Sequence, residues 1–313
     1  MFEAIKKLVE DYPKIIIHRH KNPDGDALGA QMGLKRILME NYPEKQIFAV
    51  GDMTPRYAFM ETLPLDEIDD TEYNGALAIL LDSATPALIC DDSYTKASAT
   101  ARIDHHIFCE KFTDVEVIDT SFESCCGMIT AFAMESGWQV SGESAKSLYT
   151  GMVTDSGRFS YDCTTSQTFR LASFLIDRPF NPSDIYRELY ADDLEMKQLR
   201  AKFTLKIQTT REGVAFIYTT LDEAKSYGVD NFTISRGMVN VMGDISGIHS
   251  WVNFTETDNG VLCEIRSNKY NINPIATKYG GGGHQKASGA TLKNKEEAMA
   301  MLEDLKSITE ASV

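Results

Sequence analysis

Between residues 14 and 190, short apolar segments with strand character alternate with segments of helical periodicity. The expected strands span residues 15–18, 46–50, 76–82 and 99–103, and the expected helices span residues 25–40, 124–136, 143–153 and 165–176. This alternation predicts an α/β fold in which helices cover a largely parallel sheet. Since ligands bind beyond the carboxyl ends of the strands in such folds, the polar clusters that follow several strands are candidate functional sites.

The pattern changes after Pro179 and Pro182, where a polar helical stretch begins. Beyond Gly213 we expect strands at 214–219, 249–255 and 261–266, and helices near 222–246, 273–279 and 294–308. The sequence therefore predicts three parts: a larger N-terminal domain in residues 1–188, a helical connector in 189–212 and a smaller α/β domain in 213–313.

Composition restricts the class of protein. The formal net charge is −15, whereas proteins that grip long nucleic acid through its phosphates have a basic surface. No stretch reaches the roughly 18 consecutive apolar residues of a membrane span, and the N-terminus lacks the apolar segment of a signal peptide. The six cysteines form no C-x-x-C pair. We expect a cytoplasmic protein with reduced thiols that acts on small partners and binds neither membrane nor long nucleic acid.

The first polar cluster follows the expected strand 15–18 and has the pattern H-x-x-x-D-x-D, formed by His20, Asp24 and Asp26. Two aspartates before a helix also fit a purely structural interpretation, in which Asp26 caps the helix and Asp24 lies in the turn. For this cluster alone, the structural and the functional interpretations have similar support.

Three further clusters contain carboxylates and histidines. Asp82 ends an apolar strand, and Asp104, His105 and His106 follow the strand at 99–103. A lone aspartate after a strand is more often a cap, but three titratable side chains in one short turn favour a functional site. Asp155 ends a helical segment, where the negative end of the helix dipole disfavours a carboxylate unless a cation lies nearby.

The chemistry of these side chains favours a metal site. Asp and His side chains without a cysteine partner suit Mn²⁺ or a related divalent ion better than a metal that prefers thiolates. The clusters hold five carboxylates and three histidines, which exceed the ligands that one ion needs. Two ions that share a bridging carboxylate would use them, and such two-metal centres activate water for attack on a phosphate.

A last cluster lies near the C-terminus, where Arg266 and Ser267 are followed by four glycines at 280–283 and by His284. Glycines let backbone N–H groups approach an anion, and a guanidinium can hold a phosphate in a bidentate manner. A glycine run alone more often marks a flexible loop, but the flanking Arg266 and His284 favour an anion-binding site.

In this order, the motifs H-x-x-x-D-x-D, D, D-H-H, T-D-S-G, R-S and G-G-G-G-H resemble those of the DHH phosphoesterase superfamily. The C-terminal part resembles its DHHA1 domain, so the resemblance covers nearly the whole chain. The short two-domain layout is most similar to the NrnA-type oligoribonucleases and pAp phosphatases. RecJ exonucleases share the motifs but are larger, and family II pyrophosphatases share the metal centre but have a different second domain.

The resemblance implies a role for each matching residue. It implies two divalent ions, expected to be Mn²⁺, and a catalytic group made of Asp82, Asp104 and His106. One ion would be bound by His20 and Asp24 and the other by Asp26, His105 and Asp155, with Asp82 as the bridge. His106 would contact the scissile phosphate, and Asp104 would orient the histidines. The substrate's other phosphate would be bound by Arg266, Gly281, Gly282, Gly283 and His284.

The implied activity is the Mn²⁺-dependent hydrolysis of short oligoribonucleotides, pAp or linear dinucleotides such as pApA by two-metal water attack on phosphate. A homodimer is the family expectation. Hydrolysis of pyrophosphate or short polyphosphate is an alternative, because its metal chemistry is nearly the same. A nucleotide-binding regulatory module is an alternative from another class, although such a module would have lost ligands that correspond to Asp82 or Asp155, and both are present.

Two positions depart from the usual pattern of the superfamily. A P-S-N-like segment commonly follows D-H-H, whereas Ile107, Phe108 and Cys109 stand here. A serine is common before R-S, whereas Glu264 stands two residues ahead of Arg266. A carboxylate there would oppose anion binding unless the alternation of the strand points it away from the site.

Overall fold

The computed structural model describes residues 1–60 and 64–310, and the chain divides into two compact units, Met1–Ala191 and Asp192–Val313. The boundary falls inside the stretch 189–212 that the sequence suggested as a helical connector. Helix α7 (Leu194–Leu205) packs Leu199 and Phe203 into a hydrophobic core of the second unit, so this part of the stretch is integral to that unit.

A five-stranded parallel sheet with the order β2-β1-β3-β4-β5 forms the centre of the first unit. Its strands are β1 (Lys14–His18), β2 (Gln46–Ala49), β3 (Leu77–Leu81), β4 (Ala99–Asp104) and β5 (Val115–Ile118). The prediction of an α/β fold with a largely parallel sheet is confirmed. From β1 the chain continues to β2 on one side of β1 and then returns to β3 on its other side. Ligand sites form at the carboxyl ends of the strands beside such a point, where the strand order reverses.

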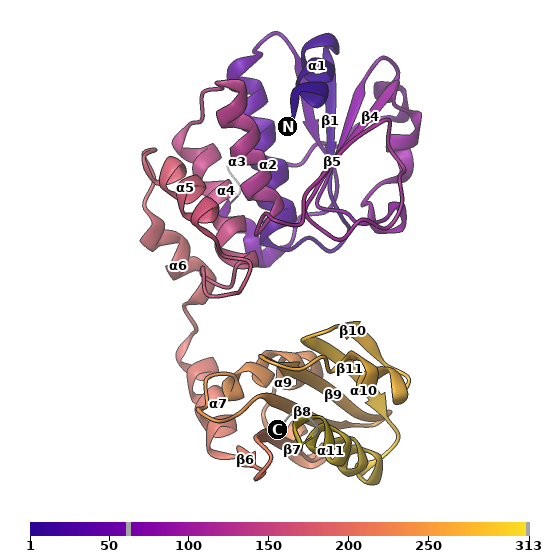
Figure 1. Cartoon of the computed structure of the whole chain (residues 1–313), viewed down its shortest axis with the longest axis vertical. Helices are drawn as coiled ribbons and strands as arrows, with labels where there is room; N and C mark the ends of the chain where they lie inside the picture. Colours follow the sequence, from indigo (N-terminus) through magenta and orange to yellow (C-terminus); the bar gives the residue numbers. More distant parts are fainter. Residues whose placement is uncertain (61–63, 311–313) are drawn as a thin grey trace. The chain divides into compact units, whose positions relative to one another are not determined.

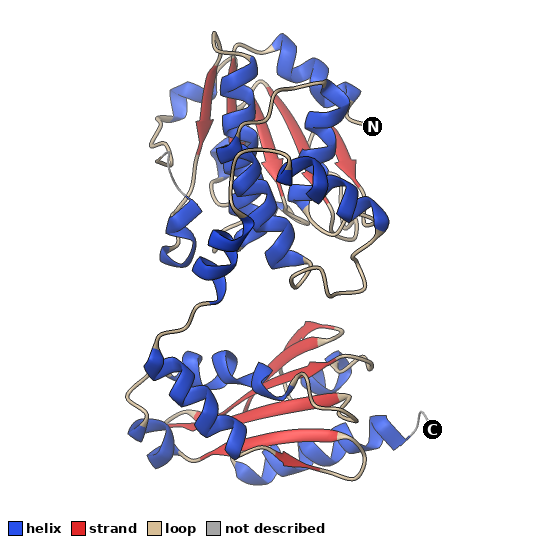
Figure 2. Cartoon of the chain, turned by 90° about the vertical axis from the view of Figure 1, so that its left-hand side faces the viewer, coloured by secondary structure: helices blue, strands red, loops and turns tan. Residues whose placement is uncertain are grey.

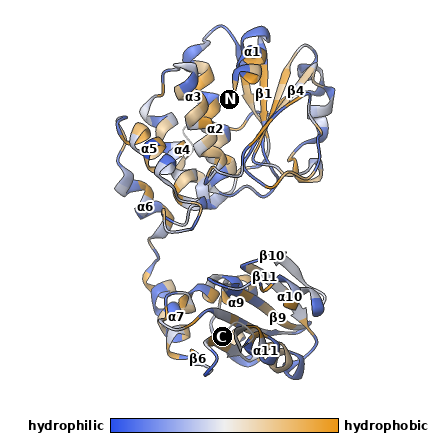
Figure 3. Ribbon diagram, in the orientation of Figure 1, coloured by the Kyte–Doolittle hydropathy of each residue, from blue (hydrophilic) through white to orange (hydrophobic). Residues whose placement is uncertain are grey.

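Helices cover one face of this sheet (Figure 1, Figure 2), and the 3₁₀ turns that carry Tyr73 and Tyr94 pack on the other. Residues alternate between the two faces along a strand, so Ile15 and Ile17 pack against the helices while Ile16 packs beside Tyr73 on the opposite face. Hydrophobic residues accordingly concentrate along the strands around β1 (Figure 3).

The four helices expected in the first unit have bounds close to the predicted ones, and two further α-helices are present in the described part of that unit. The α-helices are α1 (Glu3–Asp11), α2 (Gly25–Asn41), α3 (Cys125–Ser136), α4 (Gly142–Asp155), α5 (Ser166–Ile176) and α6 (Pro182–Tyr190). The 3₁₀ helices are η1 (Pro55–Met60), η2 (Asp70–Tyr73), η3 (Pro86–Leu88) and η4 (Asp92–Lys96).

Helices α2 and α4 approach each other closely because glycines line their contact. A Cβ atom at Gly25 would lie 2.5 Å from Oγ1 of Thr154, and one at Gly29 would lie 2.5 Å from the backbone oxygen of Ser147. Real Cβ atoms do not approach so closely, so these positions require glycine. The contact brings the first turn of α2 against the last turn of α4, which ends at Asp155.

The second unit is built on a six-stranded mixed sheet with the order β10-β11-β9-β8-β7-β6. Its strands are β6 (Gln208–Thr209), β7 (Val214–Thr219), β8 (Ser250–Thr257), β9 (Gly260–Ser267), β10 (Gly282–His284) and β11 (Ala287–Leu292). Its other helices are α8 (Leu221–Ser226), α9 (Asn231–Met238), η5 (Val239–Met242), α10 (Asn273–Lys278) and α11 (Lys295–Glu310). The single helix expected near 222–246 is thus two α-helices and a 3₁₀ turn. No helix within the described ranges is long and apolar enough to cross a membrane.

We expect Gly25→Ala to lower the free energy of unfolding by about 1–3 kcal/mol, since the added methyl group overpacks the contact with Thr154. Thr154→Ala in the same chain should restore most of the loss. Gly237→Ala is a matched control, because the nearest atom to its Cβ lies at 3.8 Å. Urea unfolding followed by circular dichroism measures all of these variants, and equal effects of Gly25→Ala and Gly237→Ala would contradict the packing argument.

Candidate metal centre

Side chains of the first unit converge at the edge of the sheet where its parallel strands end. β1, β3 and β4 lead into His20, Asp82 and His105, while the facing ends of α2 and α4 supply the other carboxylates. The side chains that the structure groups into candidate metal sites are His20, Asp24, Asp26, Asp82, His105, His106 and Asp155. The structure thus brings together all six ligands that the resemblance implies.

These side chains form three overlapping groups, in each of which the ligand atoms all lie within 4.8 Å of one another. The groups are His20, Asp24 and Asp82; Asp26, His105 and Asp155; and Asp82, His105 and His106. The first two groups coincide with the two expected ligand sets. The third joins Asp82 to the D-H-H motif.

Asp82 lies between the two ligand sets. Its Oδ2 is 3.5 Å from Nε2 of His20, and its Oδ1 is 3.5 Å from Nε2 of His105. Oδ1 is buried without a hydrogen-bond partner, which is costly unless a cation or donor is present. The backbone of Asp82 has a φ of 52°, a left-handed conformation that costs free energy in residues other than glycine and persists at functional sites. The donor set and its geometry therefore fit a bridging carboxylate.

The two aspartates of the first motif have different environments. Oδ1 of Asp24 accepts hydrogen bonds from the backbone N–H groups of Asp26 and Ala27, each at 3.0 Å, so Asp24 caps α2. The structural alternative, which assigned the cap to Asp26, is wrong. Asp26 is buried, and its carboxylate accepts hydrogen bonds from the N–H groups of Cys125 at 2.7 Å and Cys126 at 2.8 Å.

The contact between Asp26 and the first turn of α3 was missed by the sequence analysis. Backbone N–H groups at a helix N-terminus bind carboxylates well, so α3 fixes the orientation of a carboxylate that would otherwise be repelled by its neighbours. Ser124 caps α3 through its side chain, and this cap is the sequence signal for the helix start. Nothing in the sequence indicates that the helix points at Asp26, which is about a hundred residues away.

The D-H-H motif places its two histidines in different roles. Nε2 of His105 lies 3.7 Å from Asp26 and 3.4 Å from Asp155. Nδ1 of His106 lies 2.8 Å from Oδ1 of Asp104, which also accepts a hydrogen bond from the His106 backbone N–H at 3.2 Å. Asp104 therefore orients His106, whose ring is half-exposed, and Ile107 and Phe108 continue the chain as exposed residues.

The electrostatics of the cluster reflect several carboxylates in a small buried volume. Burial raises the pKa of Asp26 well above its ordinary value, and the charges of Asp82 and Asp155 raise it further. Burial likewise raises the pKa of Asp155 to about 7. At Asp82 burial opposes ionisation, but the rings of His105 and His20, each 3.5 Å away, outweigh it and hold the pKa of Asp82 below its ordinary value.

The carboxylates around His20 and His105 stabilise the protonated, charged form of both rings. Burial disfavours protonated His20 and His105, but the nearby carboxylate of Asp82, and that of Asp24 in the case of His20, raise the pKa of each ring to about 10. Without a metal ion, the protons on these rings supply the positive charge that the carboxylates need. Bound metal ions would take over this charge, since a histidine must lose its proton to become a ligand.

A buried arginine holds the loops that carry these residues, and the sequence analysis did not find it. Nη1 of Arg102 donates to the backbone oxygen of Ala84 at 3.2 Å, and its Nη2 donates to that of Glu110 at 3.2 Å. Its guanidinium also lies 4.3 Å from the ring of Phe112. Arg102 thereby ties the loop after Asp82 to the loop after D-H-H. An arginine inside an apolar strand is the only sequence signal of this role.

The second unit contains the predicted phosphate-binding residues. Gly282, Gly283 and His284 form the short strand β10 rather than a loop, and Gly281 directly precedes it. In the sheet register Arg266 pairs with Ala287, which pairs with His284. Directly opposite residues share one face of a sheet, so Arg266 and His284 flank the small side chain of Ala287.

Glu264 does not point away from Arg266. Residues two apart share a face of a strand, and Oε2 of Glu264 lies 3.0 Å from Nη1 of Arg266. The suggestion that strand alternation could separate the two side chains is therefore wrong. Glu264 pairs with Gly289, which pairs with Gly282, so a second row of residues runs beside the row that contains Arg266 and His284.

Comparisons with known proteins agree with this arrangement. The model of the DHH family N-terminal domain matches residues 14–152, and the model of the DHHA1 domain matches residues 193–311. The chain is 38% identical over 300 residues to the bifunctional oligoribonuclease and PAP phosphatase NrnA of Bacillus subtilis, covering 95% of each chain. It is 32% identical to the probable bifunctional oligoribonuclease and PAP phosphatase NrnA of Streptococcus mutans, covering 98% of each chain.

Among solved structures, an exopolyphosphatase-related protein from Bacteroides fragilis superposes with a TM-score of 0.86 at 24% identity, covering 99% of this chain and 97% of that one. This likeness shows the shared fold. Fold, site and matches together define the class as phosphoesterases with a DHH domain followed by a DHHA1 domain. The chain belongs to the DHH family.

We expect metal binding to release protons. His20 and His105, with pKa values of about 10, are protonated at pH 7.5, so binding of Mn²⁺ should release about two protons per chain from these rings. The raised pKa of Asp26 can only add to this release. The apparent affinity should accordingly rise between pH 6.5 and 8. Calorimetric titration of the chelator-treated chain with Mn²⁺ in two buffers of different ionisation enthalpy measures the release. His20→Asn should reduce it by about one proton, and binding without release would contradict the assignment.

Proposed function

We propose that the chain is a Mn²⁺-dependent phosphohydrolase of short nucleotides with a two-metal centre. The observation that carries the proposal is the position of Asp82, whose two oxygens face different ligand sets, each at 3.5 Å from a histidine nitrogen. One set is His20 and Asp24, and the other is Asp26, His105 and Asp155. Oxygen and imidazole ligands of this kind suit Mn²⁺.

The two ions would supply activation of a water molecule and neutralisation of charge on the phosphate. The protein's own residues orient the reaction. His106 is the group that contacts the scissile phosphate, and its hydrogen bond to Asp104 raises the pKa of the ring. A protonated His106 donates a hydrogen bond to a phosphate oxygen or to the leaving oxygen, which stabilises the charge that develops there.

The substrate class follows from the second unit and from the relatives. Arg266 and His284 are separated by one intervening strand, roughly 9–10 Å at the usual strand spacing. Together with the backbone of residues 281–283 they provide a second anion site, which suits a substrate with more than one phosphate. The relatives from B. subtilis and S. mutans are named for oligoribonuclease and PAP phosphatase activity, and we infer the same substrate class here.

We place this activity in the cytoplasm and, following the family expectation, in a homodimer. All six cysteines are free thiols, which supports a reducing compartment.

We expect turnover of pAp and pApA by the purified chain with Mn²⁺, and little turnover of a long RNA or of pyrophosphate. The reason is that the anion site of the second unit binds a second phosphate group of a short nucleotide. A side-by-side assay with a chelator control measures this. Preference for pyrophosphate would keep the metal centre but contradict the substrate assignment. An absence of turnover would favour a binding module instead.

We expect Asp82→Asn to lower kcat by more than about a hundredfold, because even residues that only support metal ligands change activity by 10–100-fold. Asparagine tolerates the left-handed backbone of Asp82, and loss of one charge relieves repulsion among the carboxylates, so the metal-free fold should be no less stable. Asp11→Asn, an exposed change on α1, is the matched control. Near-normal activity of Asp82→Asn would refute the bridging role.

A further inference from the structure

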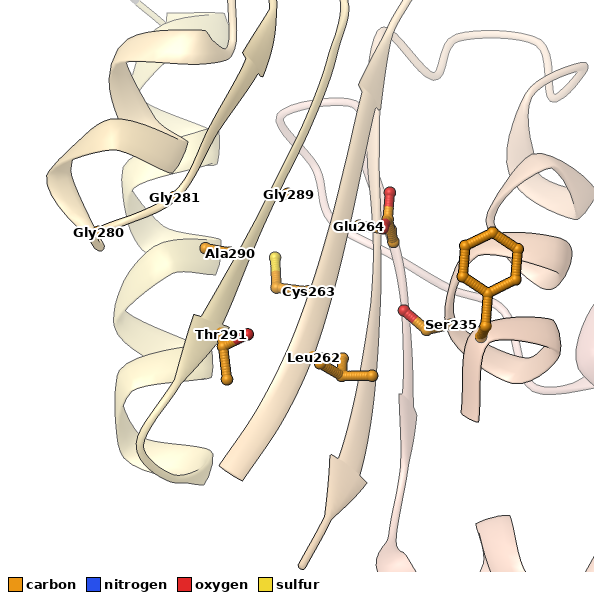
Figure 4. Close-up of a pocket in the computed structure, with 10 residues that line it drawn as sticks. Ser235, Leu262, Cys263, Glu264, Gly280, Gly281, Gly289, Ala290 and Thr291 are labelled. Carbon is orange, nitrogen blue, oxygen red and sulfur yellow. The ribbon is translucent and has the colours of Figure 1, made fainter. Parts of the chain in front are cut away.

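Preference for a nucleotide over pyrophosphate requires more than an anion site, because pAp and pyrophosphate each carry two phosphates. In the second unit, a pocket of about 460 Å³ is bordered by Glu264 and by Gly280, Gly281 and Gly289 (Figure 4). Phe232 also lines this pocket. Nucleobases stack on aromatic side chains, so exposed aromatic residues near the proposed phosphate contacts are the candidates for base recognition.

Two large apolar side chains are exposed directly after the D-H-H motif. Ile107 is 79% exposed and Phe108 is 56% exposed, and both lie in the loop between β4 and β5. Single exposed apolar residues are common on protein surfaces, and surface turns favour polar residues. These two apolar residues, however, follow His106, the residue proposed to contact the scissile phosphate. Their position indicates a surface that binds part of the substrate.

The ring of Phe108 is held by the guanidinium of Arg102. Cζ of Arg102 lies 5.9 Å from the centroid of the Phe108 ring and 4.3 Å from that of the Phe112 ring, and a cation within about 6 Å of a ring is attracted to its face. Arg102 is buried, and its hydrogen bonds to the backbone oxygens of Ala84 and Glu110 fix its position. Phe108 is therefore anchored by a rigid group while about half of its surface stays exposed.

The same contacts place Phe108 beside the metal centre. The guanidinium of Arg102 donates to the backbone oxygen of Ala84, two residues after Asp82, so the ring that it holds lies close to the loop that carries the proposed bridging carboxylate. The Cα atoms of His106 and Phe108 are at most about 7 Å apart, two residues of extended chain, which is the scale of one nucleotide. A nucleotide whose phosphate contacts His106 can therefore reach Phe108 with its base.

We propose that the base of the nucleotide whose phosphate is cleaved stacks on the exposed side of Phe108. Stacking uses the π-face that every base has, so the site accepts adenine and tolerates other bases, whereas pyrophosphate gains nothing from it. The departure of residues 107–109 from the P-S-N-like segment of the superfamily is then a specificity feature, since it puts an aromatic ring where a small polar residue is common. The proposal rests on the proposed function for its link to hydrolysis.

Steady-state hydrolysis of pAp and of its abasic analogue, ribose 3′,5′-bisphosphate, by the Mn²⁺-loaded chain tests the proposal. Phe108→Ala should raise KM for pAp about tenfold, within the range for stacking of one base, and should change kcat by less than about twofold. KM for the abasic analogue should stay the same, because it carries no base. Phe108→Tyr should keep the wild-type KM for pAp, whereas Phe108→Leu, which keeps the apolar bulk without a π-face, should behave like Phe108→Ala.

Two other phenylalanines serve as comparisons. Phe169 is 57% exposed on α5, so Phe169→Ala is the matched control and should leave both KM values unchanged. Phe232→Ala removes the aromatic side chain at the pocket of the second unit. A tenfold rise in KM for pAp in Phe232→Ala, with no rise in Phe108→Ala, would overturn the proposal. So would an equal rise for pAp and the abasic analogue in Phe108→Ala, which would indicate that Phe108 only supports the loop.

Binding of a fluorescent base separates this proposal from the proposed hydrolysis. The 2-aminopurine analogue of pAp, titrated into the chelator-treated chain, should lose fluorescence as its base stacks, and Phe108→Ala should weaken binding about tenfold and reduce the quenching. Quenching that depends on Phe108, without turnover of pAp, would support the base site and contradict the hydrolase. Turnover of pAp with quenching and KM unaffected by Phe108→Ala would support the hydrolase and overturn the base site.

Discussion

The repulsion among carboxylates at one edge of the first sheet is the constraint on which the rest of this unit depends. Asp24, Asp26, Asp82 and Asp155 contribute oxygens to the three candidate ligand groups, two of which contain Asp82. Burial, together with like charges at this spacing, raises the pKa of Asp26 and Asp155, so the ionised arrangement persists only with compensating positive charge. Histidine protons supply that charge in the metal-free chain, and divalent ions would supply more of it.

Several parts of the fold hold the carboxylates together against this repulsion. The glycine contact between α2 and α4 brings Asp155 to the first turn of α2. The positive end of α3 holds Asp26 through two backbone N–H groups. Arg102 ties together the loops beyond β3 and β4. Each of these three contacts positions residues of the candidate metal centre or the loops that carry them, and contacts of this supporting kind affect metal affinity and activity.

Much of the fold and of the candidate site could be predicted from the sequence, because hydrophobic periodicity and short motifs depend only on residues that are near one another in the chain. The parallel sheet and its main helices follow from alternating apolar segments, and the polar motifs at strand ends indicated the residues that the structure groups together. The strands β5, β6, β10 and β11 were not expected. β10 and β11 consist mainly of small residues such as Gly282 and Gly289, which carry no strand preference and pair only because β9 lies beside them.

Contacts between segments that are far apart in the chain could not be predicted from the sequence either. The cap of α2 is Asp24 rather than Asp26, because Asp26 turns toward a helix that begins about a hundred residues later. The orientation of Glu264 depends on which face of β9 carries Arg266 and on the small residues of β11 opposite. The sequence suggested that Glu264 could point away from Arg266, although a spacing of two residues along a strand places both side chains on one face. It did not indicate that the two residues form an ion pair.

The most direct test of the account is anomalous diffraction from a crystal of the chain grown with Mn²⁺. The account predicts two peaks roughly 3.5–4 Å apart, the usual separation in two-metal centres, with one oxygen of Asp82 directed at each. A single peak, or two peaks that do not share Asp82, would contradict the two-metal assignment.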